Sequence, residues 1–471
     1  MLKKLSALIF AIMLAASFAA CQKSAEVSET AETVAVTESV TAATADEAVT
    51  TEPATVAPTT EAAATQPATA AAEESSQSNS ENQTESSANV AKSTTKTEQV
   101  TSTANTTSGG MINTSELFTN RDLTQTADTY GATIYTVSDN QNITITAEGV
   151  YILQGSANNV TVTIEAGDED KVQLLLDGVT LTNANAPCIY VKNADKVFVT
   201  TASGTTNTLS VTGSFSSDGS TNTDAVIFSK DDLVLNGLGT LNIRSTDNGV
   251  TSKDDLKITG GTLNITCNSD ALEANESIAI SDGSITINAG KDGLHAEYDE
   301  DNSTGYIYIC GGAFNITAGS DGIQATTVCQ IDGGNIRISA SEGIEGTFVQ
   351  INGGDITISA SDDGINASRK STAYNVRIEI NGGSVTVNMG QGDTDGIDSN
   401  GDLCINGGTV TVNAQSPFDY DGTAQKTGGT IIVNGSQTDA ITNQMMGGVG
   451  GIQPGGQAQG NAPMQGGFNR R

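Results

Sequence analysis

Short stretches of alternating apolar and polar residues recur along the middle of the chain. Alternation with period two is typical of a strand that buries one face. Each stretch is preceded by a Gly-Gly pair or an equivalent turn, and the pattern returns every 20 to 23 residues where there is no insertion. Four of the clearest examples are Thr262–Cys267, Ser284–Ala289, Asn335–Ala340 and Asp355–Ala360.

A repeat of this length accommodates three short strands and three turns, which is one rung of a right-handed parallel β-helix. A rung cannot bury its apolar face alone, so neighbouring rungs must stack and form continuous apolar columns. The alignment predicts one column from Ile258, Ile280, Ile309, Ile331, Ile351, Ile380 and Ile405, and a second from Leu263, Ile285, Phe314, Ile336, Ile356, Val385 and Val410. We therefore predict an all-β solenoid.

Nine clear rungs run from about Asp224 to Gly435, and residues 143–211 contain similar, less regular strands. These predict earlier rungs of the same solenoid, so residues 111–445 form one domain. Its five cysteines are odd in number and fall on scattered rungs, which favours free thiols over a disulfide framework.

The two ends have other compositions. Residues 1–21 combine Lys3 and Lys4 with an apolar run and end at Cys21, as in a lipoprotein signal peptide. We expect Cys21 to carry the lipid and to hold the protein on the outer face of the cytoplasmic membrane, at the cell surface. An ordinary cleaved signal is the alternative. The Ala/Thr/Ser/Glu segment 22–110 predicts a disordered tether, and the Gly-rich segment 446–471 a disordered tail.

The acidic net charge of the chain limits the molecules that it could bind. The whole chain has a net charge of −34, and residues 111–445 alone contain 42 acidic and 14 basic residues. Such a chain repels nucleic acid, which we exclude as a partner. A single histidine also excludes most triad and His-rich metal chemistry. Metal cations or cationic surfaces are the expected partners, although acidity could serve only solubility.

An acidic residue followed by Gly or Ala and an aliphatic residue recurs before one strand of each rung. Stacking would place these carboxylates ~4.8 Å apart along one edge, where they repel by roughly 3 to 4 kcal/mol at an effective dielectric of 20. Ca²⁺, a hard cation with oxygen ligands, would offset this repulsion. The alternative is a purely structural Asp-Gly turn. The ladder comprises Asp270, Asp292, Asp321, Glu342, Asp363 and Asp395, of which the first three are our predicted metal ligands.

A second candidate metal site comes from Ser-Lys-Asp-Asp-Leu, which occurs at 229–233 and again at 252–256. Alignment puts Asp231, Asp254 and Glu276 in one column, with Asp232 and Asp255 beside them. Such paired carboxylates could supply the oxygens that Ca²⁺ requires. Lys230 and Lys253 could neutralise them instead. The predicted ligands here are Asp231, Asp232, Asp247, Asp254 and Asp255.

Four residues near these columns are candidates for carbohydrate contact: Lys253, Lys291, His295 and Glu297. His295 lies just before an acidic insertion, residues 297–302, which begins at Glu297 and could be a ligand loop or only a solvated bulge.

These linked motifs resemble clostridial cell-surface carbohydrate-binding proteins, which have a calcium-containing right-handed parallel β-helix and are related to polysaccharide lyase family nine. The resemblance covers roughly 140–435. It rests on the two Ser-Lys-Asp-Asp-Leu motifs and on the segments 292–297, 395–401 and 417–422. It implies calcium binding and affinity for acidic plant polysaccharide such as polygalacturonate or pectin, and cellulose is a further candidate.

Three functions are compatible with these features. The first is a calcium-dependent carbohydrate-binding protein, a monomer that contacts the membrane only through its lipid anchor. The second is a pectate-lyase-like β-eliminase with Lys253 or Lys291 as base, a role that acidic neighbours of Lys253 oppose. The third is a surface adhesin or stalk without a specific glycan. We expect the first, with no catalytic residue.

Overall fold

The computed structural model describes residues 110–219, 221–298, 300–392 and 394–443, all within one compact unit of the chain. The predicted signal peptide, Cys21, the tether and the Gly-rich tail lie outside the described residues. The described residues form 34 strands and no helix, so none of them provides a helix that could cross a membrane.

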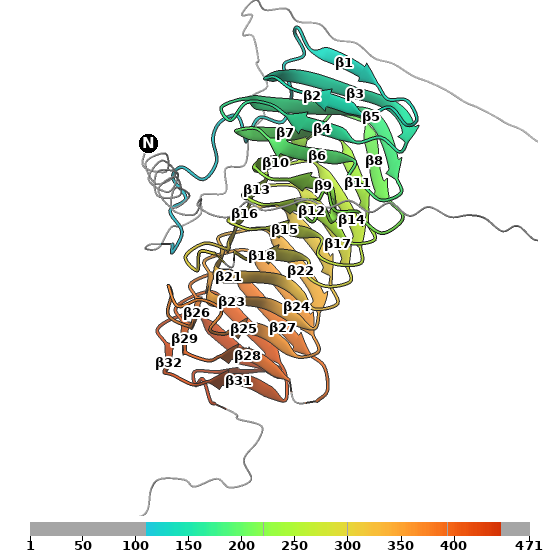
Figure 1. Ribbon diagram of the computed structural model, residues 1–471. Coiled ribbons are helices and arrows are strands. Elements are labelled where there is room, and N and C mark those ends of the chain that lie inside the picture. Colours follow the sequence, from blue (N-terminus) through green and yellow to red (C-terminus); the bar gives the residue numbers. More distant parts are fainter. Residues whose placement is uncertain (1–109, 220, 299, 393, 444–471) are drawn as a thin grey trace, which may run out of the picture. The chain divides into compact units, whose positions relative to one another are not determined.

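The strands stack as rungs of a parallel β-helix (Figure 1). Strand pairing runs between successive rungs and is parallel throughout, except for the final pair β33–β34. The pairings make three sheets, which we number in the order in which each rung passes through them. The all-β solenoid predicted from the sequence is therefore confirmed.

Sheet 1 contains the amino-terminal halves of β21 (Asp321–Ile331) and β23 (Glu342–Ile351), together with β2 (Ile143–Ile145), β4 (Val162–Glu165), β6 (Ile189–Asn193), β9 (Ala225–Ser229), β12 (Asn248–Ser252), β15 (Leu272–Ala274), β18 (Leu294–Ala296), β25 (Asp363–Ala367), β28 (Asp395–Ser399) and β31 (Ser416–Tyr420).

Sheet 2 contains the amino-terminal halves of β3 (Gly149–Asn158) and β5 (Lys171–Asn183), the carboxy-terminal halves of β21 and β23, and β1 (Thr133–Thr136), β7 (Lys196–Thr201), β10 (Asp232–Gly237), β13 (Asp255–Ile258), β16 (Ser277–Ile280), β19 (Tyr306–Ile309), β26 (Arg377–Ile380), β29 (Asp402–Ile405) and β32 (Ala424–Lys426).

Sheet 3 contains the carboxy-terminal halves of β3 and β5, and β8 (Thr206–Val211), β11 (Thr240–Arg244), β14 (Thr262–Cys267), β17 (Ser284–Ala289), β20 (Ala313–Thr317), β22 (Asn335–Ala340), β24 (Asp355–Ala360), β27 (Ser384–Met389), β30 (Thr409–Asn413), β33 (Thr430–Val433) and β34 (Ser436–Thr438).

The core includes the two apolar columns that the repeat predicted. Ile258 pairs with Ile280, and the same register continues rung by rung to Ile405 in sheet 2. The column that begins at Leu263 continues likewise to Val410 in sheet 3. All members of both columns are buried. The five cysteines of the domain are free thiols, as expected.

Stacked glycines form the turn between sheets 2 and 3. Gly408 has φ +73°, a conformation that side chains disfavour. A Cβ atom at this position would lie 2.6 Å from the carbonyl oxygen of Gly383 in the preceding rung. The Gly-Gly pairs therefore serve two needs, the left-handed backbone and the close approach of successive rungs.

Residues 110–125, which we call the strap, run along the outside of sheet 2 in the direction opposite to the succession of rungs. The backbone N–H of Met111 donates to the Gln350 side chain at 3.1 Å, whereas Gln125 donates to the carbonyl of Thr259 at 2.9 Å. Between them, Asp122 is fully buried, with Lys196 3.6 Å and Lys257 3.9 Å away. The strap thus covers the outer face of this sheet over several rungs.

Candidate functional site

The outer face of sheet 1 carries the predicted ladder of carboxylates. Asp321 pairs with Glu342, and Asp363 pairs with Asp395, in register. The N–H of Asp292 donates to Oδ1 of Asp270 at 3.0 Å, and the N–H of Asp321 donates to Oδ1 of Asp292 at 2.9 Å. One carboxylate oxygen therefore links successive rungs, while the other is left for a further partner.

Two of the stacked carboxylates, Asp321 and Asp363, resist ionisation. Burial and the charges of Asp292, Glu342 and Glu345 raise the pKa of Asp321 to about 8. Burial and neighbouring carboxylates likewise raise the pKa of Asp363 to about 7. The ladder therefore needs protons, cations or both to neutralise it at neutral pH.

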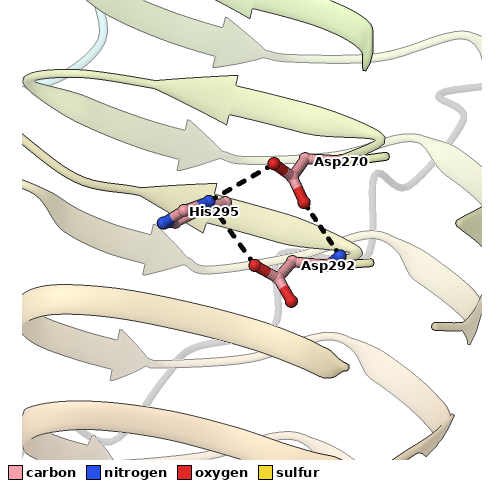
Figure 2. A group of neighbouring side chains, drawn as sticks. All are labelled: Asp270, Asp292 and His295. Atoms are coloured by element: carbon pink, nitrogen blue, oxygen red, sulfur yellow. Dashed lines mark hydrogen bonds and ion pairs between the residues drawn. The ribbon is translucent and has the colours of Figure 1, made fainter. Parts of the chain in front are cut away.

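His295 supplies positive charge at the start of the ladder (Figure 2). Its Nδ1 lies 3.4 Å from Oδ2 of Asp292 and 3.6 Å from Oδ2 of Asp270, and its Nε2 lies 3.0 Å from Oε2 of Glu297. Burial alone would lower the pKa of His295, but its interactions with the three carboxylates raise it to about 9. An imidazolium thus sits between Asp270 and Asp292 at neutral pH.

Lys370 supplies charge further along. Its Nζ lies 2.8 Å from Oε2 of Glu345, which is buried. The side-chain oxygen of Gln324 accepts from Lys370 Nζ at 2.8 Å, and its amide nitrogen donates to Oδ2 of Asp292 and of Asp321 at 3.2 Å each. A continuous polar network therefore joins the ladder to Lys370, which comes from an inserted loop.

The acidic insertion and strand β23 hold the loop that carries Lys370. Asn302, in the acidic insertion, donates to Oγ1 of Thr372 at 2.7 Å. The N–H of Lys370 itself donates to Oγ1 of Thr347 at 3.1 Å. The acidic insertion thus braces a second loop, a role that neither interpretation of the sequence foresaw.

Asp254, Asp255 and Glu276 form a separate cluster at the corner between sheets 1 and 2. Each offers a carboxylate oxygen within 4.8 Å of the others. Burial, together with the charges of Asp232 and Glu276, raises the pKa of Asp254 to about 7. Ser277 donates to Oδ1 of Asp255 at 2.6 Å, and neither aspartate forms an ion pair with a described basic residue. The cluster therefore concentrates negative charge without a protein cation in contact with its aspartates.

The remaining predicted ligands of this region lie outside the cluster, and the charge of Asp232 still acts on Asp254. The Asp231 carboxylate accepts from the N–H of Ala194 at 3.0 Å, and Asp232 pairs with Lys196 at 3.2 Å. Asp247 belongs to none of the carboxylate clusters found among the described residues. The clusters retain five of the eight predicted ligands, namely Asp254, Asp255, Asp270, Asp292 and Asp321.

The predicted carbohydrate contacts also differ in position. His295 and Glu297 interact with each other on the outer face of sheet 1. Lys253 pairs with Glu273 at 3.1 Å on the same face, two rungs closer to the amino terminus. Lys291 is exposed in the turn before β18, and its charge acts on Asp270.

The sequence interpretation missed several residues of the network. Gln324 and Glu345 occupy the outward position three residues after a ladder acid, as His295 does. That spacing is a usable signal, because each acid-Gly-aliphatic unit is followed by a polar residue at this position. No such signal exists for Lys370, which lies outside the repeat.

The donor atoms of the three clusters determine how well each could hold Ca²⁺. Ca²⁺ takes oxygen ligands, and Asp254, Asp255 and Glu276 offer only oxygens. The cluster of Asp321, Glu342 and Glu345 is also all oxygen, but Lys370 already contacts Glu345. The cluster of Asp270, Asp292 and His295 includes an imidazole, which suits other metals better than calcium. The first cluster therefore fits calcium best.

Comparison with known proteins gives the class of the chain. The model of the carbohydrate-binding domain-containing protein family matches residues 139–396, more than half of the sequence. The chain belongs to this family, which confirms the resemblance inferred from its motifs.

Individual relatives extend the comparison. A carbohydrate-binding domain-containing protein from Acetivibrio thermocellus is 35% identical over 124 residues, which are 26% of this chain and 43% of that protein. This chain thus aligns with less than half of its curated relative. A solved structure, that of the polysaccharide lyase-like protein from C. thermocellum as a gadolinium derivative, is 28% identical with a TM-score of 0.43, covering 50% of this chain and 96% of the other.

Proposed function

We propose that this protein is a calcium-dependent binder of acidic polysaccharide, with polygalacturonate or pectin as its ligand class. The observation that carries the proposal is the oxygen-only cluster of Asp254, Asp255 and Glu276. Family membership supports carbohydrate as the ligand. The calcium requirement and the acidic character of the glycan are the steps beyond that membership.

The charge of the chain motivates calcium. A chain with a net charge of −34 repels a uronic-acid polymer, so direct contact between the two is unfavourable. Bound calcium supplies positive charge that carboxylates of both partners can share. Asp254, Asp255 and Glu276 would hold it at a corner of the solenoid, and Ser277 would orient Asp255 through its hydrogen bond.

We favour binding over β-elimination because of the surroundings of Lys253. Its Nζ lies 3.1 Å from Glu273 and 5.8 Å from the centre of the Phe228 ring. Both contacts engage the Lys253 amino group, whereas a catalytic base must be free to reach the proton that it abstracts. The stacked hydroxyl and amide side chains on the sheet surfaces would add hydrogen bonds to sugar hydroxyls.

Cell-surface anchoring is part of the proposal. The apolar leader ending at Cys21 supports lipid attachment. If this is right, Cys21→Ala should release the protein into the medium, and a variant that stays on the membrane with unchanged processing would refute the anchor.

The decisive experiment is Asp254→Asn combined with Asp255→Asn. In wild-type protein we expect calcium to raise the melting temperature and to be required for polygalacturonate binding; ligation by the folded state alone adds about 2.7 kcal/mol at one hundred times Kd. The double variant should lose one calcium equivalent and the binding. In chelator it should be more stable than wild type, because carboxylate repulsion is removed.

Asp282→Asn with Asp355→Asn is the matched control, since it removes two exposed carboxylates elsewhere. This control should behave as wild type in calorimetry, thermal melts and binding. A double variant of the cluster with unchanged calcium stoichiometry and unchanged polygalacturonate affinity would show that Asp254 and Asp255 are surface groups only.

A further inference from the structure

Three lysines stack on consecutive rungs of sheet 1. The first, Lys192, lies near the end of β6, while Lys230 and Lys253 directly follow β9 and β12. The strand register aligns the three positions. The N–H of Lys230 donates to the carbonyl of Val191 at 3.0 Å, and that of Lys253 to the carbonyl of Ser229 at 2.8 Å. We call this column the lysine ladder. The repeated Ser-Lys-Asp-Asp motif predicts only two of its members.

Two aromatic rings underlie the lysine ladder. Tyr190 and Phe228 are buried neighbours on the same face, with ring centres 5.8 Å apart in an edge-on arrangement. The Nζ atoms of Lys192 and Lys230 lie 5.5 and 5.8 Å from the centre of Tyr190, and Nζ of Lys253 lies 5.8 Å from that of Phe228. Cation–π attraction thus holds two ammonium groups over Tyr190 and the third over the neighbouring Phe228.

Carboxylates of the protein interact with two of the three lysines. Lys253 pairs with Glu273 at 3.1 Å, and Lys230 lies 3.9 Å from Asp218, which also accepts from the Tyr190 hydroxyl. Lys192 is exposed and forms no ion pair with any residue that the structure describes. The charges of Lys253 and Lys230 also act on Asp224 and Asp231. Stacked like charges repel, so an anion that bridges the three ammonium groups would relieve this repulsion, with Lys192 as its most accessible contact.

The position of the lysine ladder ties it to the calcium cluster. Asp254 and Asp255 follow Lys253 directly in sequence, so the ladder and the cluster lie side by side at one corner of the solenoid. The column continues with Asn275 and then Glu297, whose N–H groups bond to the preceding rungs. Positive charge is therefore confined to three rungs, and an acidic residue ends it.

We propose that the lysine ladder is a metal-free subsite for consecutive carboxylates of an acidic polysaccharide that lies along the solenoid axis. The spacing of the lysines is that of the strands, ~4.8 Å, similar to the length of one sugar in an extended chain. Lysine ammonium groups pair with carboxylates as point charges. This inference rests on the proposed function. It adds the orientation of the glycan along the solenoid axis and the residues that bind its carboxylates.

The test is Lys192→Gln with Lys230→Gln in the full chain. These changes remove two charges and keep the aliphatic stems over Tyr190. With calcium present at low salt, Kd for oligogalacturonate should rise by about tenfold for the two charges together. Salt should weaken wild-type binding more than variant binding. A carboxyl-reduced oligosaccharide should not distinguish the two proteins.

Arg244→Gln with Arg337→Gln is the control of equal charge, since both arginines are exposed on sheet 3. An equal loss in this control would mean that only net charge matters and would overturn the lysine ladder. Unchanged affinity in the lysine variant would also overturn it, while calcium-dependent binding by wild type would leave the proposed function standing. Wild type that fails to bind oligogalacturonate in calcium would refute both.

Discussion

Ionisation of the carboxylates at the carboxyl-terminal end of the acidic ladder should destabilise the solenoid. Asp398 follows Asp395 by three residues on β28 and pairs in register with Asp419 of the next rung. Burial, followed by the charges of Asp419, Asp395 and Asp421, raises the pKa of Asp398 to about 7. We predict that Asp398→Asn stabilises the metal-free protein at pH 8.

The magnitude follows from proton linkage. An aspartate in the unfolded chain has a pKa near 3.8, so the rise is about three units, or roughly 4 kcal/mol at ~1.36 kcal/mol per unit. Asp398 is only half-buried, and halving the value for solvent screening leaves about 2 kcal/mol.

The sign of the pH dependence is fixed by which state holds the proton. Between pH 4 and 7 the folded protein keeps a proton on Asp398 that the unfolded chain has lost. Stability therefore falls as pH rises through this window, and the full penalty applies above pH 7. Asp398→Asn should accordingly gain nothing at pH 4 and about 2 kcal/mol at pH 8.

Urea denaturation in chelator at pH 5, 6, 7 and 8 measures this effect. Wild type should lose stability along the series, and Asp398→Asn should lose less. Asp355→Asn is the control, because Asp355 is an exposed carboxylate on sheet 3. A wild-type protein that gains stability from pH 5 to pH 8, or an Asp398 variant that matches the control at pH 8, would refute the reasoning.

Two further predictions concern the bracing loop and the glycine turns. Lys370→Met should lower the free energy of unfolding in chelator by about 2 kcal/mol, because the buried Glu345 carboxylate loses its ion pair and keeps the hydrogen bond from Ser368. Arg369→Met in the same loop should leave the stability unchanged, and equal urea midpoints for the two variants would contradict this. Gly408→Ala should lower the melting temperature far more than Gly435→Ala. Both glycines have positive φ, but a Cβ at Gly408 would meet the Gly383 carbonyl, whereas a Cβ at Gly435 meets nothing within 4 Å. Similar melting temperatures of the two variants would contradict the close-packing argument.

The repeat carried most of the information about the fold. Period-two alternation fixes which side of a strand is buried, and an isoleucine column such as Ile258 to Ile405 fixes the register, because one slipped residue would expose it. The strap could not be foreseen in this way. Residues 110–125 contact sheet 2 through side chains such as Gln125 and Asp122, and they follow no periodic pattern.

The site was predictable where it follows the repeat. The stacking of Asp270, Asp292 and Asp321 came directly from the alignment of rungs. What neutralises them did not, because that depends on side chains which reach across rungs. His295 lies between two carboxylates, and Lys370 arrives from a loop that folds back over rungs made earlier.

The strap also imposes an order on folding. Its residues are synthesised before any rung, yet Met111 bonds to Gln350, 239 positions later in the chain. Contacts of such sequence separation form late, because the loop they close must first be ordered by other contacts. Docking of the strap can therefore be complete only after the rung that contains Gln350 has formed. Protection of the Met111 amide from hydrogen exchange would thus report a step that follows the formation of this rung.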